Sequence, residues 1–124
     1  MLALAEVNRE VRCIVLTGSG AGFCAGGDVK GMAASGDGTV GAQTIDEAIA
    51  RQRVNQRATA GKLFSMPKPT IAAVNGAAVA GGAGLVSVCD LAVADPGAKF
   101  GYPEVKRGLF AAAGGLIRAV AAGT

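Results

Sequence analysis

The segment at residues 70–90, TIAAVNGAAVAGGAGLVSVCD, places three glycines just ahead of an apolar run. Gly81, Gly82 and Gly84 fall within four positions, although each glycine inside a helix or strand costs roughly 0.5–1 kcal/mol relative to alanine. Such a concentration indicates that something approaches the backbone closely at that point. The segment as a whole predicts a buried strand at 70–74, a turn at Asn75-Gly76 and a helix at 81–88.

Residues 71–89 contain no charged side chain, which raises the alternative of a membrane span. The run is barely long enough to cross a bilayer, contains Asn75 and four glycines, and follows Pro67 and Pro69. We therefore favour a strand and a core helix over a span, and expect no membrane association.

The composition limits the chain to one globular domain, residues 1–124, with a core of small side chains. Hydrophobic residues make up 51% of the sequence, charged residues 17% and aromatic residues only 4%. The net charge of +3 is scattered and forms no basic stripe with interleaved aromatics, so we expect no nucleic-acid partner. Three distant cysteines and the absence of histidine predict neither disulfides nor a metal site, and favour a reducing, cytoplasmic setting.

Strands alternate with helices along the chain, which predicts an α/β fold. Strands are expected at residues 11–17, 70–74, 91–95 and 98–102. Helices are expected just after the glycine pair 26–27, at 44–66, at 81–88 and from 114 to 120. The first residues resemble the last turns of a helix and the final ones the start of another, so we expect both ends to be truncated.

Residues 44–66 predict one long amphipathic helix. Thr44 is the expected N-cap, and Glu47 three residues later completes a capping box. The apolar face expected for this helix is partial, and consists of Ile45, Ala48, Ile49, Val54 and Leu63.

Several catalytic and binding motifs are weak or excluded. Residues 36–41, GDGTVG, match the spacing of a dinucleotide fingerprint but do not follow a predicted strand. Ser19 and Ser87 have no histidine partner, which excludes a Ser–His nucleophile.

Two glycine pairs, Gly26-Gly27 and Gly81-Gly82, each follow a buried strand and open a short helix. The first N–H groups of a helix have no intrahelical partner and carry partial positive charge. If the two helix starts converge, they form an oxyanion hole; alternatively, the glycines only permit tight packing of helix on strand. The residues alone leave both interpretations open.

Two stretches, AGFCAGGDVKGM and KPTIAAVNGAAVAGGAGLVSVCDLAVADPGAKFGYPEVKRGL, resemble the crotonase family, the enoyl-CoA hydratase/isomerase superfamily. The matching segments run from about Val11 to Gly115 and cover roughly half of the family's usual catalytic domain. The resemblance implies a crotonase-like β-β-α spiral superhelix that is incomplete, since the N-terminal strands and the C-terminal helical part are missing. It also implies a homo-oligomer, a trimer or a dimer of trimers.

The resemblance assigns a role to the glycine pairs. In the family, a thioester carbonyl lies between two backbone N–H donors, and these positions fall on Gly27 and Gly81. No metal or redox cofactor is implied, because peptide dipoles hold the enolate and coenzyme A is part of the substrate. The positions that the family uses around CoA fall on Ala25, Gly26, Asp28 and Lys30. Lys30 falls where the family often has a basic residue that contacts the CoA phosphates; the alternative is that Lys30 is a solvated charge on a helix.

The acid–base residues depart from the family pattern. Hydratases of the family use two glutamates; the second matches Glu104 in FGYPEV, whereas the first falls on Gly84 and is lost. The alternative for Glu104 is an ordinary surface carboxylate, and Asp90 is expected to be structural. The resemblance implies a lyase or isomerase that acts on an acyl-CoA thioester through an enolate. The alternative is a catalytically inactive truncated fragment or an acyl-CoA-binding module.

Overall fold

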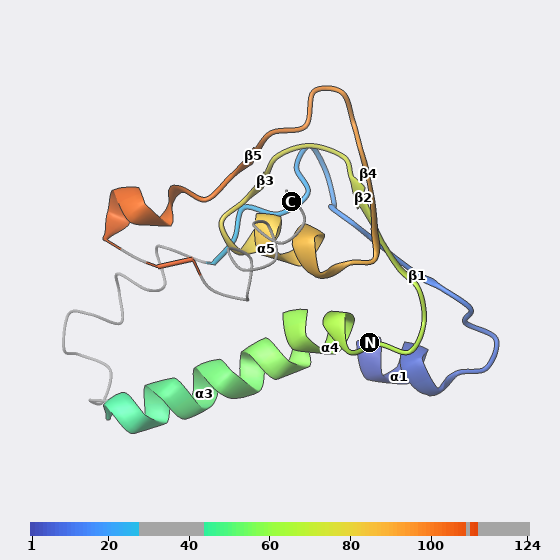
Figure 1. Cartoon of the computed structure of the whole chain (residues 1–124), viewed down its shortest axis with the longest axis horizontal. Helices are drawn as coiled ribbons and strands as arrows, with labels where there is room; N and C mark the ends of the chain where they lie inside the picture. Colours follow the sequence, from blue (N-terminus) through green and yellow to red (C-terminus); the bar gives the residue numbers. More distant parts are fainter. Residues whose placement is uncertain (28–43, 109, 112–124) are drawn as a thin grey trace.

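Strands and helices alternate along the chain, as the sequence predicts (Figure 1). The structure is a computed structural model, and it describes residues 1–27, 44–108 and 110–111. Its helices are α1 (Leu2–Val7), α3 (Ile45–Ala58), α4 (Ala60–Phe64), α5 (Gly81–Val88) and the 3-10 turn η1 (Pro103–Arg107). Its strands are β1 (Ile14–Thr17), β2 (Thr70–Val74), β3 (Ala78–Val79), β4 (Leu91–Ala94) and β5 (Phe100–Gly101).

The larger sheet is parallel, with the strand order β1-β2-β4. Side chains of the central strand β2 alternate between its two faces, and Thr70, Ala72 and Val74 are buried. Ala72 and Val74 form a core cluster with Phe23 and Ala78, against which residues of α5 pack. Apart from Phe23, the buried residues of this cluster have small side chains, as the composition predicts.

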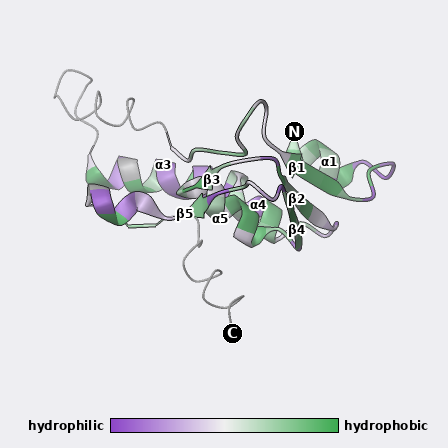
Figure 2. Ribbon diagram, turned by 90° about the horizontal axis from the view of Figure 1, so that it is seen from above, coloured by the Kyte–Doolittle hydropathy of each residue, from purple (hydrophilic) through white to green (hydrophobic). Residues whose placement is uncertain are grey.

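The opposite face of this sheet is apolar and open in the part of the chain that the structure describes. Val15 of β1 is 58% exposed, and Leu91 and Val93 of β4 are 61% and 67% exposed. In Figure 2, β1, β2 and β4 are coloured as hydrophobic. Strands that are apolar along their length are typical of parallel sheets, in which both faces are usually covered. The described residues cover only one face of this sheet.

A second, two-stranded parallel sheet pairs β3 with β5. The sequence predicts β5 within 98–102, but β3 is too short and too rich in alanine to be recognised as a strand. Cys24 adds an isolated parallel bridge to Ala78, so β3 lies between the loop that follows β1 and the segment that follows β4.

The prediction of a single helix at 44–66 is wrong. The chain forms two helices there, α3 and α4, which meet at Thr59. Thr59 has φ −114° and ψ −97°, outside the helical range, and its hydroxyl donates to the Asn55 carbonyl at 2.8 Å. The predicted capping box is confirmed, because Thr44 Oγ1 accepts from the Glu47 N–H and the Glu47 carboxylate accepts from the Thr44 N–H. The Thr44 N–H, followed by the Thr44 hydroxyl, holds the pKa of the Glu47 carboxyl below its ordinary value.

Most of the apolar face predicted for this helix is not buried. Ile45, Ile49 and Val54 are 79%, 43% and 65% exposed, whereas Leu63 of α4 is buried. Figure 1 shows why: α3 extends away from the sheets, and only α4 lies close to α5. The helix, loop and C-terminal helix expected within 28–43 and 114–120 lie outside the described residues.

Asp90 is structural, as expected from its place between α5 and β4. Its carboxylate accepts from both the N–H and the hydroxyl of the buried Thr70 at 2.8 Å, and the hydroxyl accepts from the Asp90 N–H at 3.0 Å. The Thr70 N–H, followed by the hydroxyl, holds the pKa of Asp90 below its ordinary value. This pair ties the start of β2 to the start of β4.

Candidate functional site

The loop after β1 and the turn after β2 are joined by the side chain of Asn75. Its Oδ1 accepts from the Gly18 N–H at 3.0 Å, and its Nδ2 donates to the Gly20 carbonyl at 2.8 Å. Gly76 lets the two backbones meet, because a Cβ there would lie only 2.1 Å from the Ala21 carbonyl oxygen. The sequence predicts only a turn at Asn75-Gly76. That the Asn75 amide also bridges two loops could not be predicted, because its partners Gly18 and Gly20 lie far away in the sequence.

The first glycine loop, residues 22–27, is held against β3 by backbone hydrogen bonds. The N–H groups of Phe23 and Cys24 both donate to the Ala77 carbonyl, at 3.0 and 3.1 Å, and the Cys24 carbonyl accepts from the Val79 N–H at 3.0 Å. Phe23 anchors this loop in the core. The loop therefore runs alongside β3 towards the start of α5.

The two glycine segments converge in the structure. A Cβ added to Gly26, which has φ +88°, would lie 2.8 Å from the Ala80 methyl and 3.2 Å from the Gly81 nitrogen. Gly26, one residue before Gly27, therefore lies directly beside Gly81. The segment that carries Gly27 and the start of α5 therefore lie side by side.

Packing explains some of these glycines but not all of them. A Cβ on Gly82 would lie 2.1 Å from the Cys24 carbonyl oxygen, so this glycine is needed for close approach. A Cβ on Gly81 would meet only the Gly26 Cα, at an ordinary 3.8 Å. Close packing therefore explains why positions 26 and 82 are glycine. Position 81 has room for a side chain, so packing does not explain Gly81.

The first N–H groups of α5 have no acceptor among the residues that the structure describes. The first bond of this helix runs from the Gly84 N–H to the Ala80 carbonyl at 3.2 Å, and Ala80 provides no side-chain cap. Among the described residues, none accepts a hydrogen bond from the N–H of Gly27 or of Gly81. The first N–H groups of a helix carry partial positive charge, which favours an oxygen acceptor.

Glu104 is linked to the same region through β5. The Ala80 N–H donates to the Gly101 carbonyl at 2.8 Å, and Glu104 follows in the first turn of η1. The side chain is half-buried, and its Oε2 is buried with no hydrogen-bond partner in the part of the chain that the structure describes. The apolar residues close to Glu104 in the sequence contribute little to this burial, because Phe100 and Val105 are 54% and 78% exposed. Glu104 thus differs from a fully solvated surface carboxylate.

The remaining predicted positions divide between described and undescribed residues. Gly84 is buried within α5, and Ala25 is exposed at the tip of the first glycine loop. Asp28 and Lys30 lie outside the described residues. Ala80, which sequence reasoning missed, stands at the junction of all these segments; a small apolar residue beside glycines gives no signal.

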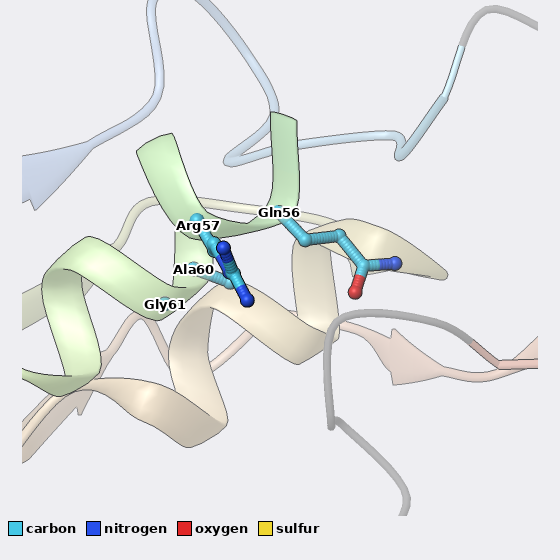
Figure 3. A pocket seen from close by; sticks show the side chains of 4 residues that line it. All are labelled: Gln56, Arg57, Ala60 and Gly61. Carbon is cyan, nitrogen blue, oxygen red and sulfur yellow. The ribbon is translucent and has the colours of Figure 1, made fainter. Parts of the chain in front are cut away.

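A shallow pocket lies elsewhere, where α3 meets α4 (Figure 3). It measures about 210 Å³ and is lined by Gln56, Arg57, Ala60 and Gly61. Pockets for drug-sized ligands usually measure about 300–1,000 Å³, so this one is small. None of the predicted site residues lines it.

The described residues contain neither a candidate metal site nor a candidate membrane span. No group of three or more histidine, cysteine, aspartate or glutamate side chains that could hold a metal ion occurs there. Within the same ranges, no helix has the length and apolar character needed to cross a membrane.

Known proteins resemble this chain in both sequence and structure. A family model described as enoyl-CoA hydratase/isomerase matches residues 1–122. The chain is 42% identical over 115 residues to the mevalonyl-coenzyme A hydratase SIDH of Beauveria bassiana, covering 91% of this chain and 40% of that protein. An enoyl-CoA hydratase structure from Polaromonas sp. JS666 superimposes with a TM-score of 0.81 at 35% identity, over 94% of this chain and 43% of the other. One from Geobacillus kaustophilus gives 0.75 at 40% identity, over 96% and 43%.

The expected fold, a partial crotonase-type α/β fold, is confirmed by these structural matches. The chain spans less than half the length of the curated relatives it matches, between 36% and 44% for those most similar to it.

Proposed function

Because the chain belongs to the enoyl-CoA hydratase/isomerase family, we propose that its two glycine segments bind the carbonyl of an acyl-CoA thioester. The observation that carries this proposal is the contact of Gly26 with Ala80 and Gly81. It brings the segment that ends at Gly27 to the N-terminus of α5, where the Gly81 N–H has no partner among the described residues. The two N–H groups of Gly27 and Gly81 then donate to one thioester oxygen.

This arrangement suits a reaction that passes through an enolate. Removing a proton from C2 of the acyl group moves negative charge onto the thioester oxygen, and fixed N–H donors stabilise that charge without reorganising. Loss of one such donor in an oxyanion hole lowers kcat by about 10²–10³. No metal ion is needed for this step, since the backbone supplies the electrostatic stabilisation.

Glu104 is the proposed general acid and base. Its half-buried side chain and unpartnered Oε2 leave one carboxylate oxygen free to accept a proton. In an isomerisation, Glu104 removes a proton from C2 of a 3-enoyl thioester and returns it at C4, so that the double bond moves to C2–C3 and the proton count is unchanged.

Gly84 favours this isomerisation over hydration. Hydration must deprotonate the water that attacks C3 and also deliver a proton to C2, which the family divides between two carboxylates. Gly84 offers no side chain for the first of these. A chain that binds the thioester without turning it over is the second candidate function, and the same glycine favours it.

Turnover separates these candidates. With a 3-enoyl-CoA, we expect Glu104→Gln to abolish conversion while binding of the thioester persists. With a short 2-enoyl-CoA, Gly84→Glu should raise hydration above that of the parent chain. Hydration that survives in Glu104→Gln would refute the assigned role. Binding without conversion of either substrate would establish the binding module.

We also propose that Ala25, Gly26, Asp28 and Lys30 contact the CoA moiety. The exposed position of Ala25 on the first glycine loop supports this, because the loop leads directly to Gly27. Lys30→Gln should raise KM for a CoA thioester but not for the matching pantetheine thioester, which lacks the nucleotide phosphates. An equal rise for both would contradict a phosphate contact.

We further propose that the protein acts in the cytoplasm as a homo-oligomer, a trimer or a dimer of trimers. The described cysteines, Cys13, Cys24 and Cys89, are free thiols, which suits a reducing compartment. Native mass spectrometry of the protein gives the subunit number, and a monomer at micromolar concentration would contradict the oligomer.

A further inference from the structure

Ala80 has a backbone conformation that residues with a side chain rarely adopt. Its φ of 53° and ψ of −126° make it the one non-glycine residue with positive φ in the described ranges. These angles match the first central position of a type II′ turn, which glycine normally occupies. Such strain persists only where the surroundings determine the conformation.

Three contacts determine the conformation of Ala80. Its N–H donates to the Gly101 carbonyl at 2.8 Å, and its carbonyl accepts from the Gly84 N–H at 3.2 Å. Its methyl occupies the space that a Cβ on Gly26 would need, at 2.8 Å from that position. The residue is thus fixed from β5, from α5 and from the first glycine loop.

The direction of the Gly81 N–H follows from this conformation. The peptide between Ala80 and Gly81 is planar, so the ψ angle of Ala80 sets the direction in which the Gly81 N–H points. With an ordinary ψ the same N–H would be turned away from its present direction, while Gly81 could still begin the helix. We propose that Ala80 is a positioning residue, whose strained backbone aims the Gly81 N–H at the substrate oxygen.

This inference rests on the proposed function of Gly81 as an oxyanion donor, but it adds a residue that touches no reacting atom. The same positioning role explains why position 80 is alanine and not glycine. Glycine would adopt the same angles without strain, yet it would leave empty the space beside Gly26 that the methyl fills, and the peptide would rotate more freely. A β-branched side chain at this position would be disfavoured by the positive φ.

The strain is tested first, by a readout that is independent of activity. Ala80→Gly relieves the positive φ and should leave the urea midpoint of unfolding unchanged or higher. The matched control is Ala94→Gly, at an alanine of β4 without positive φ, which should lower the midpoint through the added freedom of the unfolded chain. Equal losses in the two variants would overturn the strain at Ala80.

The positioning role is tested with two ligands that differ only at the carbonyl. One is an unreactive saturated acyl-CoA thioester, and the other is its thioether, in which CH₂ replaces the carbonyl. Titration calorimetry of Ala80→Gly should show a preference for the thioester reduced about tenfold, with thioether affinity unchanged, since only the fixed orientation of the Gly81 N–H is lost. Ala94→Gly, which removes a methyl from β4 away from the glycine segments, should keep the parent preference.

The possible results separate the two claims. If the parent chain binds thioester and thioether equally, the oxyanion role of Gly81 fails, and the positioning role fails with it. If the parent prefers the thioester and Ala80→Gly retains that preference in full, only the positioning role is overturned. A loss of preference in Ala94→Gly of the same size would also overturn it, because it would show a general loosening of the protein.

Discussion

Gly81 and Gly82 are adjacent in sequence, yet alanine substitutions at the two positions should have opposite effects on stability. At Gly82 a new Cβ would lie 2.1 Å from the Cys24 carbonyl oxygen, about 0.9 Å short of the 3.0 Å that real Cβ contacts respect. At Gly81 the nearest atom would be the Gly26 Cα at 3.8 Å, which is ordinary contact.

The magnitude follows from what Gly82→Ala must displace. The Cys24 carbonyl accepts the Val79 N–H at 3.0 Å, so moving it weakens a bond worth about 0.5–1.5 kcal/mol. Overpacking in a buried site adds about 1–3 kcal/mol, and the better helix propensity of alanine returns about 0.5–1 kcal/mol. We expect Gly82→Ala to lower the free energy of unfolding by roughly 2–3 kcal/mol. Gly81→Ala should leave it unchanged or raise it by up to about 0.5 kcal/mol.

Urea unfolding followed by circular dichroism measures both variants against the parent. If Gly82→Ala is unfolded in buffer, trimethylamine N-oxide shifts all three proteins towards the folded state and restores the comparison. A Gly82→Ala protein as stable as Gly81→Ala would refute the close approach of the first glycine loop to α5, and with it the convergence of the two segments.

Three further predictions concern stability and association. Thr70 lowers the pKa of Asp90, so the Asp90 carboxylate contributes its full stabilisation above about pH 5 and loses it as the pH falls through its folded-state pKa. The stability of Asp90→Asn should therefore fall less with acid in that range than the stability of the parent chain. An acid transition that is the same in both proteins would contradict this. Lys68 donates to the carbonyls of Ala5 and Asn8 at 2.6 Å, so Lys68→Met should speed amide exchange in α1 by about tenfold, whereas exchange in β2 stays unchanged. The open sheet face should make the chain self-associate with concentration in sedimentation experiments, and a monodisperse monomer with a cooperative high-temperature melt would contradict this.

The elements at the centre of the fold could be predicted because their local pattern and their tertiary role agree. The strand at 70–74 and the helix at 81–88 match the observed β2 and α5, since an unbroken apolar run bounded by prolines and glycines allows few alternatives. The break at Thr59 could not be predicted, because it depends on a hydroxyl that bonds back to Asn55 within a sequence of good helix formers.

The resemblance to the crotonase family places the two donors on Gly27 and Gly81, and this assignment stays a prediction. The approach of the two glycine segments could not be predicted, because it depends on contacts between residues far apart in sequence. Ala80 and Asn75 are ordinary in sequence, and their importance arises from a positive φ and from a bridge between loops that form only in the folded chain.

The measurement that tests the central claim most directly is infrared difference spectroscopy of a bound enoyl-CoA labelled with ¹³C at the thioester carbonyl. Two N–H donors at Gly27 and Gly81 should polarise that carbonyl and lower its stretching frequency relative to the free thioester. Replacing Gly81 by its α-hydroxy acid counterpart exchanges the N–H for oxygen and should return part of that shift, whereas Gly81→Ala, which keeps the N–H, should not. A carbonyl frequency that is the same for bound and free thioester would contradict the account.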